Sequence, residues 1–533
     1  MIRTLTHVNE QVLYEIEEEK RLRKTQEMFI LLALGSQFDH LITMNLAKLG
    51  VFCLVADPAR ISAGDINTLA PQGIILSGGP VSVYADPPPF DSAIFTLGIP
   101  VLGICLGFQL WAKYVGAIVT PASTREYGVH TLHIHSSSLL FEKVGSETPV
   151  LESHGDKILL GDALEVLAST QHASVAAGRH GHLWGVQFHP EVSDTVEGLQ
   201  ILKNFCFSIC GAKDRYPARE EAARKVTQLR GQIGRKRVLV ALSGGSDSSV
   251  VAYLLKSGVE GRCGQIRAVY IEGVDRMDDR RHVETYFGNA RWLNLQIVDE
   301  TRTFLKAVAG KASAAEKRLA MREVYRNALI QQCLDFKAEF IVQGTLYTDI
   351  SESGGGYESG ARKAQIKLHH NVGLDFPVPE ICPLNDQVKD TARSIGRAIG
   401  VPGELLARHP FPGPGLLVRI EGEVTAEKLQ IARRVDDIWI QNLHDAGFYK
   451  KVWQAGAIVT ASLHTFTKGD DAGMGRVVRL FAVDSVNGFT ARASLLPPDF
   501  IERVAQQITN EVPEVASVDY RYSGKPPATI ECG

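Results

Sequence analysis

The chain has 533 residues, of which 45% are hydrophobic and 22% charged, and this composition excludes a disordered or low-complexity protein. A chain of this length exceeds one ordinary hydrophobic core, so we expect roughly three domains. The formal net charge of −3 gives no overall attraction to nucleic acid, so we expect no nucleic-acid partner and assign any anion binding to local sites.

The cysteine spacing and the apolar runs indicate a cytoplasmic location. The eight cysteines show no paired CxxC spacing, so neither a disulfide framework nor a zinc site is indicated. The charged N-terminal segment lacks the apolar region of a signal peptide, and no later run reaches the roughly 18 apolar residues of a membrane span. We therefore expect no membrane partner.

Taken in chain order, the elements predict an α/β protein with an N-terminal extension. Residues 1–27 form the extension, in which charges at helical spacing predict an exposed helix over 9–27. Short apolar runs alternating with helical stretches predict one α/β domain over 28–211 and a second, with a parallel sheet, over 212–407. Residues 408–533 mix strand-like and helix-like segments, so we expect a small α+β domain there.

The segment GICLGFQ, residues 103–109, sets one cysteine between two glycines after an apolar strand. Cys105 is either a buried core thiol or a nucleophile on a strained strand-to-helix turn, where helix N–H dipoles favour the thiolate. A nucleophile needs a base held by a third group, and GVQFHPE offers His189 and Glu191 two residues apart. Two backbone N–H groups, of Gly79 in ILSGGP and of Leu106, are candidates for an oxyanion hole.

The motifs SGGP, GICLGFQ, SHGDK and GVQFHPE, in this order, resemble the class I glutamine amidotransferase domain. The resemblance implies that Cys105 attacks the glutamine side-chain amide, that His189 moves the proton and that Glu191 holds His189, so that ammonia is released. It also implies that Gln109 helps to hold glutamine. His154 and Asp156 either face a domain contact or have a purely structural role.

A second loop, ALSGGSDSSV, joins a strand to a helical pattern. Its glycines and hydroxyls at a helix N-terminus predict a phosphate site, and Asp247 within it suits a Mg²⁺ ion. The loop lacks the lysine of a Walker A motif. By itself it could be a structural turn, but SGGxDSS resembles the PP-loop of ATP pyrophosphatases, which implies ATP as co-substrate. The implied ATP-binding residues are Ser243, Gly244, Gly245, Ser246, Asp247, Ser248, Ser249 and Lys367.

Lys367 belongs to ARKAQIKLHHN, a basic run at 361–371 that also contains Lys363, His369 and His370. Such a run is either a solvated face or, after a PP-loop, a lid over the triphosphate whose positive charge meets the developing pyrophosphate.

Both domains together with RHPFPGPG and the terminal SGKPPATIE resemble the glutamine-hydrolysing GMP synthetase family over about residues 28–533. The resemblance implies that ATP adenylates an oxo group of XMP and that ammonia displaces AMP. It implies acceptor contacts by Arg276, Lys525 and Glu531, and a dimerisation role for the last domain.

Departures from the family pattern gather near the acceptor. The segment 454–476 differs from the usual one, Phe481 stands where an arginine is usual, and Asn487 where an aspartate is usual. The family's YPD and IEWE are here Tyr347-Thr348-Asp349 and Ile530-Glu531-Cys532-Gly533. The chain could thus be a paralogue for another oxo-purine or related nucleotide, or an inactive binding homologue. Retention of Cys105, His189, Glu191 and Asp247 speaks against inactivity.

Overall fold

The computed structural model describes residues 4–36, 38–84, 89–259, 264–346, 374–387, 389–468, 470–485, 491–525 and 528–531. These residues form two compact units, one ending at Arg224 and the other beginning at Lys225. No helix in these ranges is both long and apolar enough to cross a membrane. The finer predicted boundaries, at 27/28, 211/212 and 407/408, stay predictions.

The first unit is built on a nine-stranded sheet in the order β2-β1-β3-β4-β9-β8-β7-β5-β6. Strands β2, β1, β3, β4 and β9 are parallel, and the remaining pairings are antiparallel. The strands are β1 Phe29–Leu32, β2 Cys53–Ala56, β3 Gly73–Leu76, β4 Val101–Ile104, β5 Val119–Ile134, β6 Glu147–Ile158, β7 Glu165–Ser169, β8 Ala177–His180 and β9 Leu183–Val186.

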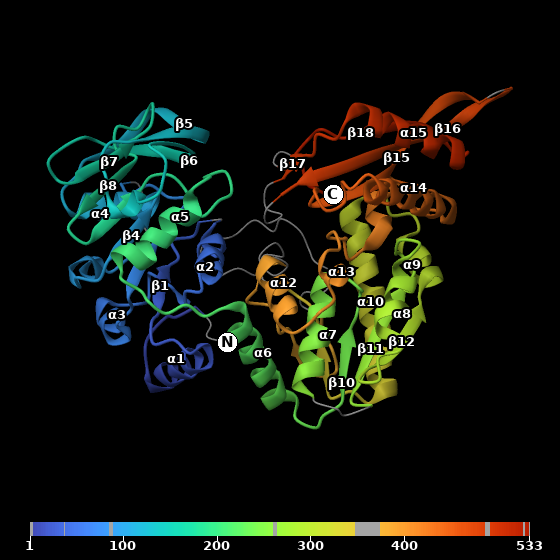
Figure 1. Cartoon of the computed structure of the whole chain (residues 1–533), viewed down its shortest axis with the longest axis horizontal. Coiled ribbons are helices and arrows are strands. Elements are labelled where there is room, and N and C mark those ends of the chain that lie inside the picture. Colours follow the sequence, from blue (N-terminus) through green and yellow to red (C-terminus); the bar gives the residue numbers. More distant parts are fainter. Residues whose placement is uncertain are drawn as a thin grey trace. The chain divides into compact units, whose positions relative to one another are not determined.

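Helices accompany this sheet, as Figure 1 shows. They are α1 Glu10–Arg23, α2 Asp39–Lys48, α3 Ala63–Leu69, α4 Leu106–Tyr114 and α5 Gly198–Lys203, with short η1 Ser92–Thr96, η2 Leu139–Phe141 and η3 Asn204–Ile209. The parallel strands β1, β3 and β4 are buried along their whole length, which explains their uninterrupted apolar sequences.

The N-terminal helix forms as predicted, between the side-chain cap of Asn9 and Arg23, but it is not simply exposed. Ile16 is buried in the core of the first unit, and Leu5 pairs with Ala56 at the edge of the sheet. The expectation of an exposed helix was wrong in this respect, because charge spacing reports the solvated face and not the narrow apolar stripe opposite it.

The second unit contains a five-stranded parallel sheet in the order β12-β11-β10-β13-β14. Its strands are β10 Val238–Ala241, β11 Ile266–Glu272, β12 Asn294–Asp299, β13 Phe340–Val342 and β14 Glu380–Ile381. The helices are α6 Ala218–Ile233, whose first turns belong to the first unit, α7 Ser246–Gly258, α8 Asp279–Phe287, α9 Thr301–Val308, α10 Ala314–Phe336, α12 Lys389–Ala398 and α13 Gly403–Leu406.

The C-terminal part of this unit is the α+β region that the sequence predicts. The hairpin β15 Gln454–Lys468 and β16 Asp471–Asp484 carries β17 Arg492–Ala493 and, in parallel, β18 Val515–Tyr520. Helices α14 Ala426–Asp445 and α15 Pro498–Glu511 and the short η4 Gly415–Arg419 complete it. One hydrophobic core runs from Leu239 of β10 through Trp439 of α14 to Val478 of β16, so both sheets of the second unit share it.

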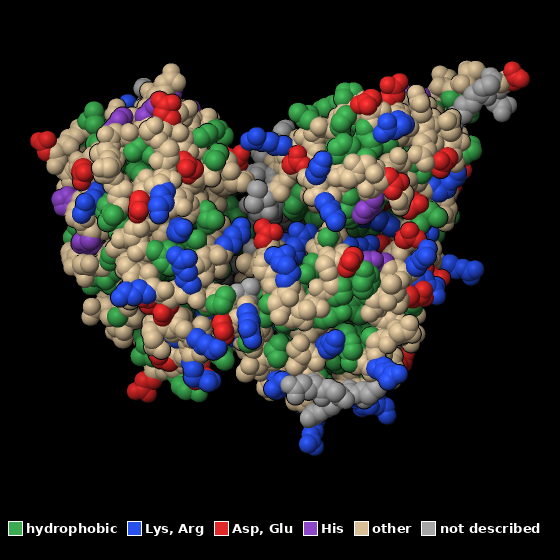
Figure 2. All heavy atoms as spheres, in the orientation of Figure 1, with side chains coloured by type: hydrophobic (Ala, Val, Ile, Leu, Met, Phe, Trp, Pro, Cys, Tyr) green, Lys and Arg blue, Asp and Glu red, His purple; other side chains and the backbone are tan. Residues whose placement is uncertain are grey.

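On the face of the molecule seen in Figure 2, Lys and Arg side chains are interspersed with Asp and Glu side chains. This mixed pattern fits the small net charge of the chain.

Candidate functional site

Cys105 lies on the sharp turn between β4 and α4. Its backbone has φ 49° and ψ −104°, a conformation that residues other than glycine rarely adopt. The flanking glycines are required by close packing, because a Cβ on Gly103 would lie 2.5 Å from the Phe108 nitrogen and one on Gly107 2.6 Å from Leu76. The turn is therefore strained, as GICLG predicts, and the helix begins directly after the thiol.

His189 and Glu191 follow β9 and form a buried pair. The distance from His189 Nδ1 to Glu191 Oε1 is 2.7 Å. Thr195 Oγ1 donates to the His189 carbonyl at 2.6 Å, and the His189 amide donates to Leu151, so the backbone of His189 is also held. Burial disfavours the imidazolium, but the Glu191 carboxylate and hydrogen bonding to Cys105 outweigh it and raise the pKa of His189 well above its usual value.

The structure thus brings Cys105, His189 and Glu191 together, although more than 80 residues separate the first from the others. Gln187 also reaches the thiol, since its Nε2 lies 3.6 Å from Cys105 Sγ. Sequence reasoning did not assign Gln187, although it belongs to the quoted GVQFHPE.

The glycine turn after β3 approaches the same thiol. A Cβ on Gly78 would lie 3.0 Å from His189 Cε1 and 3.7 Å from Cys105 Cβ, so this glycine lies close to both side chains. A Cβ on Gly79 would meet Leu106 Cδ2 at 2.5 Å, so Gly79 packs against the side chain of Leu106. Gly78 was missed, and the double glycine of ILSGGP was the signal for it.

Gln109 is buried in α4, one turn beyond Cys105. Its Nε2 lies 3.3 Å from Gln187 Oε1 and 3.4 Å from the Asp156 carbonyl. His154 is buried too, with Nε2 at 3.2 Å from Glu126 and 3.1 Å from Glu152. Neither glutamate was singled out from the sequence.

The predicted phosphate loop joins β10 to α7, and Gly245 is the N-cap of that helix. Gly244 has φ 71°, and its carbonyl accepts a hydrogen bond from Arg408 at 3.0 Å. The hydroxyls of Ser243 and Ser248 lie 3.0 Å apart, and Ser249 donates to Gly245 at 2.8 Å. The hydroxyls of Ser248 and Ser249 thus hold the turn from within, whereas Ser243 is exposed beside the N-terminus of α7, where phosphate oxygens can be bound.

Asp247 lies in the first turn of α7 with a partly exposed carboxylate. Ser246 Oγ donates to Oδ1 at 2.8 Å, and Lys389 Nζ lies 3.7 Å from Oδ2. A carboxylate oxygen with access to solvent fits a Mg²⁺ ligand, because Mg²⁺ prefers oxygen donors and keeps several waters. Lys389, which the sequence analysis did not single out, brings a positive charge to the same loop.

The acceptor candidates Arg276 and Glu531 are joined through two buried residues that sequence reasoning missed. Arg276 Nε lies 2.6 Å from Asp436, and Asp436 accepts from Arg419 at 2.9 Å. Arg419 in turn makes a bidentate pair with Glu531, at 2.7 and 2.9 Å. Arg419 and Asp436 are fully buried, so Glu531 is tied into a charge network inside the protein.

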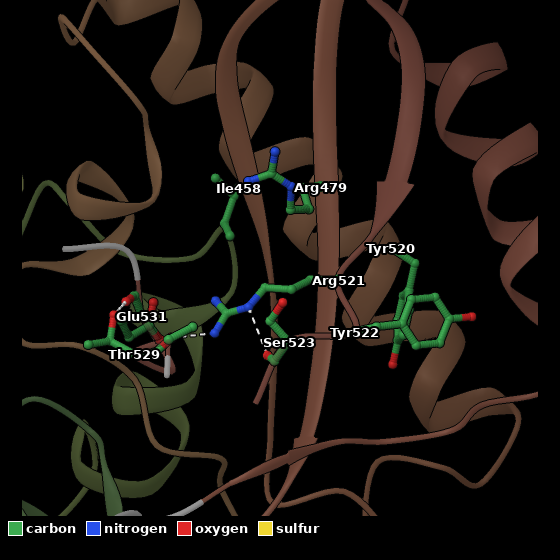
Figure 3. A pocket seen from close by; sticks show the side chains of 9 residues that line it. Ile458, Arg479, Tyr520, Arg521, Tyr522, Ser523, Thr529 and Glu531 are labelled. Atoms are coloured by element: carbon green, nitrogen blue, oxygen red, sulfur yellow. Dashed lines mark hydrogen bonds between the residues drawn. The ribbon is translucent and has the colours of Figure 1, made fainter. Parts of the chain in front are cut away.

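A pocket of about 450 Å³ lies next to this network. It is lined by Ile458, Arg479, Tyr520, Arg521, Tyr522, Ser523, Ala528, Thr529 and Glu531. Figure 3 shows the Arg521 side chain extending toward Thr529, with Tyr520 and Tyr522 on the other side of Arg521.

Phe481 is fully buried behind the network, 5.2 Å from the Arg419 guanidinium. Lys525 pairs through its backbone with Ala491 near the same sheet. Arginine is thus present at this pocket as Arg479 and Arg521 rather than at position 481.

Several sequence expectations lie outside the described residues. They are the lid residues Lys363, Lys367, His369 and His370, the tripeptide Tyr347-Thr348-Asp349, Asn487, and the terminal Cys532 and Gly533.

Comparison with known proteins finds family matches in the N-terminal and C-terminal parts of the chain. Residues 30–209 match the family model of glutamine amidotransferase class-I, and residues 441–532 match that of the GMP synthase C terminal domain. A GMP synthase (glutamine-hydrolyzing) of Petrotoga mobilis is 38% identical over 517 residues, which covers 95% of this chain and 99% of the relative. The protein of the same name from Aquifex aeolicus is 38% identical over 508 residues, covering 93% and 98%.

Proposed function

This chain belongs to the family of glutamine-hydrolysing GMP synthases, and we propose that Cys105, His189 and Glu191 supply the ammonia for a ligase that converts XMP to GMP. The observation that carries this proposal is the buried His189–Glu191 pair beside a thiol held on a strained turn. It supports nucleophilic catalysis because the raised pKa of His189 favours an imidazolium next to a thiolate.

In the proposed first reaction, Cys105 Sγ attacks the side-chain carbonyl of glutamine. The carbonyl oxygen becomes an oxyanion, for which the backbone N–H groups of Gly79 and Leu106 are the proposed donors. His189 gives its proton to the leaving nitrogen, and ammonia departs. Water then cleaves the thioester, with His189 accepting its proton, so that glutamate is released and the thiol is restored.

In the proposed second reaction, the oxo oxygen of XMP attacks the α-phosphorus of ATP, and pyrophosphate leaves. Ammonia adds to the adenylated carbon, loses a proton, and displaces AMP to give GMP. The loop from Ser243 to Ser249 is the proposed phosphate cradle, because its hydroxyls lie at the N-terminus of α7. Bound Mg²⁺, held by Asp247, would offset the charge of the phosphates. Lys367 is the proposed lid residue over them.

The proposed acceptor site is the C-terminal pocket, with Arg276 and Lys525 contacting XMP. The network from Arg276 through Asp436 and Arg419 supports a positioning role for Glu531 rather than a free carboxylate that meets the acceptor. We also propose that the chain acts in the cytoplasm and forms a homodimer through its C-terminal region, both from the family resemblance.

The purified protein tests the proposal when it is incubated with XMP, ATP, Mg²⁺ and amide-¹⁵N glutamine. We expect GMP that carries ¹⁵N in its new amino group, with AMP, pyrophosphate and glutamate formed in equal amounts. The formation of ADP, or GMP without the label in the absence of added ammonium, would contradict it. A panel of other oxo-purine nucleotides, run in parallel, would reveal a preferred acceptor different from XMP.

A further inference from the structure

The first unit contains a buried cluster of two glutamates and one histidine that the proposed chemistry does not use. Glu152 and His154 are two residues apart on β6 and therefore point to the same face of the sheet. Glu126 on β5 is the register partner of His154 across the antiparallel pair. The three side chains meet because of strand pairing, so the separation of Glu126 from the others along the sequence conceals the cluster.

These side chains are almost wholly removed from water. Both glutamates are 0% exposed and His154 is 3% exposed at the side chain. Within the described parts of the chain, His154 Nε2 and both Glu152 carboxylate oxygens lack a hydrogen-bond partner, although they lie close to one another. Burial of two carboxylates carries a large desolvation cost, which a positive species between them would offset.

The hydrogen bond of His154 Nδ1 also supports a cation site. Its Nδ1 lies 2.9 Å from the Asp156 carbonyl oxygen, which can only accept, so Nδ1 carries a proton. Nε2 is then the ring nitrogen that faces the two carboxylates. This is the common arrangement of a metal-binding histidine, whose other nitrogen donates to a carbonyl and fixes the ring.

Distances and charge both fit a divalent transition-metal ion. Metal bonds of about 2.0–2.1 Å at tetrahedral angles place ligand atoms about 3.3 Å apart. His154 Nε2 lies 3.2 Å from Glu126 Oε2 and 3.1 Å from Glu152 Oε2, and one ligand atom from each residue falls within 4.8 Å of the others. A divalent cation between these side chains would offset the negative charge of the buried carboxylates.

We propose that Glu126, Glu152 and His154 bind a Zn²⁺-class divalent cation with three protein ligands and one open position. Thr170 supports the site because its hydroxyl donates to both oxygens of Glu126, at 2.7 and 3.0 Å. The expectation of no zinc site in the sequence analysis rested on the lack of CxxC pairs. That argument applies to sites with cysteine ligands and not to a site made of two glutamates and a histidine. The cation would tie β5 to β6 beside Ser153, whose carbonyl lies 4.0 Å from Cys105 Sγ.

Zinc binding to the full-length protein tests the proposal. The protein is stripped with a chelator, loaded with Zn²⁺ and freed of excess, and the bound metal is measured by mass spectrometry. We expect one zinc per chain in the wild type and in Cys105→Ala, and at least a tenfold loss of affinity in Glu152→Gln and Glu126→Gln. Glu147→Gln is the matched control, because Glu147 lies on the same strand with a 68% exposed side chain.

Cobalt loading provides a readout that does not need the variants to fold. Wild-type protein with Co²⁺ should show the visible absorption of low-coordinate cobalt without a thiolate charge-transfer band. Less than about a tenth of a zinc per chain in the wild type, equal binding by wild type and correctly folded Glu152→Gln, or a thiolate band would each overturn the proposal.

Discussion

The glutaminase candidates and the acceptor candidates differ in how their charged groups are satisfied. In the first unit, His189 and Glu191 pair with each other and lie beside the Cys105 thiol and the glycine turn after β3. In the second unit, Arg276 and Glu531 are both engaged by buried partners, Asp436 and Arg419. The candidates in the first unit therefore come from two short sequence segments, each of which can be recognised by its motif. The role of a single charged residue such as Arg276 or Glu531 depends instead on the groups that the fold places beside it.

The largest expected effect comes from removing the thiol. Cys105→Ala should lower glutamine-dependent GMP formation by on the order of 10³-fold or more, because the thiol proposed to form the thioester is removed. Ammonium-dependent synthesis should persist at close to the wild-type rate. Cys53→Ala, which alters a partly buried thiol of β2 in the same unit, is the control. Glutamine hydrolysis at the wild-type rate by Cys105→Ala would remove Cys105 from the reaction.

A substitution in the predicted phosphate loop should lower activity with both nitrogen sources, unlike Cys105→Ala. Asp247→Asn should lower AMP formation roughly 10²-fold with either glutamine or ammonium, since a metal ligand beside the phosphates is lost. Asp335→Asn, an exposed change on α10, should have no effect. If the Asp247 variant retains full activity at limiting Mg²⁺, the carboxylate does not hold the ion.

The buried charge network should matter for stability more than for affinity. Glu531→Gln leaves Arg419 short of one negative partner in a dry environment, so we expect a loss of about 3–5 kcal/mol in the free energy of unfolding. Chemical denaturation measures it. The exposed pair Arg434–Glu514 provides the control, because Glu514→Gln should cost about 0–1 kcal/mol. Equal losses for both variants would mean that Glu531 is not part of a desolvated network.

A substitution of Lys525 tests whether this residue contacts the acceptor nucleotide. Lys525→Ala should raise KM for XMP about 10-fold or more while KM for ATP changes little, as expected for losing a charge-assisted hydrogen bond worth roughly 1.5–3 kcal/mol. Steady-state kinetics with each substrate varied in turn decides it. A parallel rise in both constants would point to a general structural effect instead.

The smallest expected change is a shift in the pH profile of glutamine hydrolysis. Glu191 raises the pKa of His189, so Glu191→Gln should lower that pKa. The imidazolium then loses its proton at a lower pH, so the alkaline limb of kcat/KM should move to lower pH. An unchanged alkaline limb would indicate that Glu191 does not act on the titrating group.

The sequence by itself predicted several features whose residues are close along the chain. The strained turn at Cys105, the helix after the phosphate loop and the pairing of His189 with Glu191 follow from glycines, apolar runs and a two-residue spacing. Such features are local, because the backbone conformation of a few residues sets the direction of each side chain.

Only the tertiary structure decided the partners that come from distant segments. Glu126 meets His154 through strand register, Arg419 joins Asp436 to Glu531 across more than 90 residues, and Ile16 finds a core that the charge pattern of its helix conceals. The physical reason is that burial and ion pairing depend on which surfaces pack together, and packing is decided by the whole chain rather than by the spacing within any one segment.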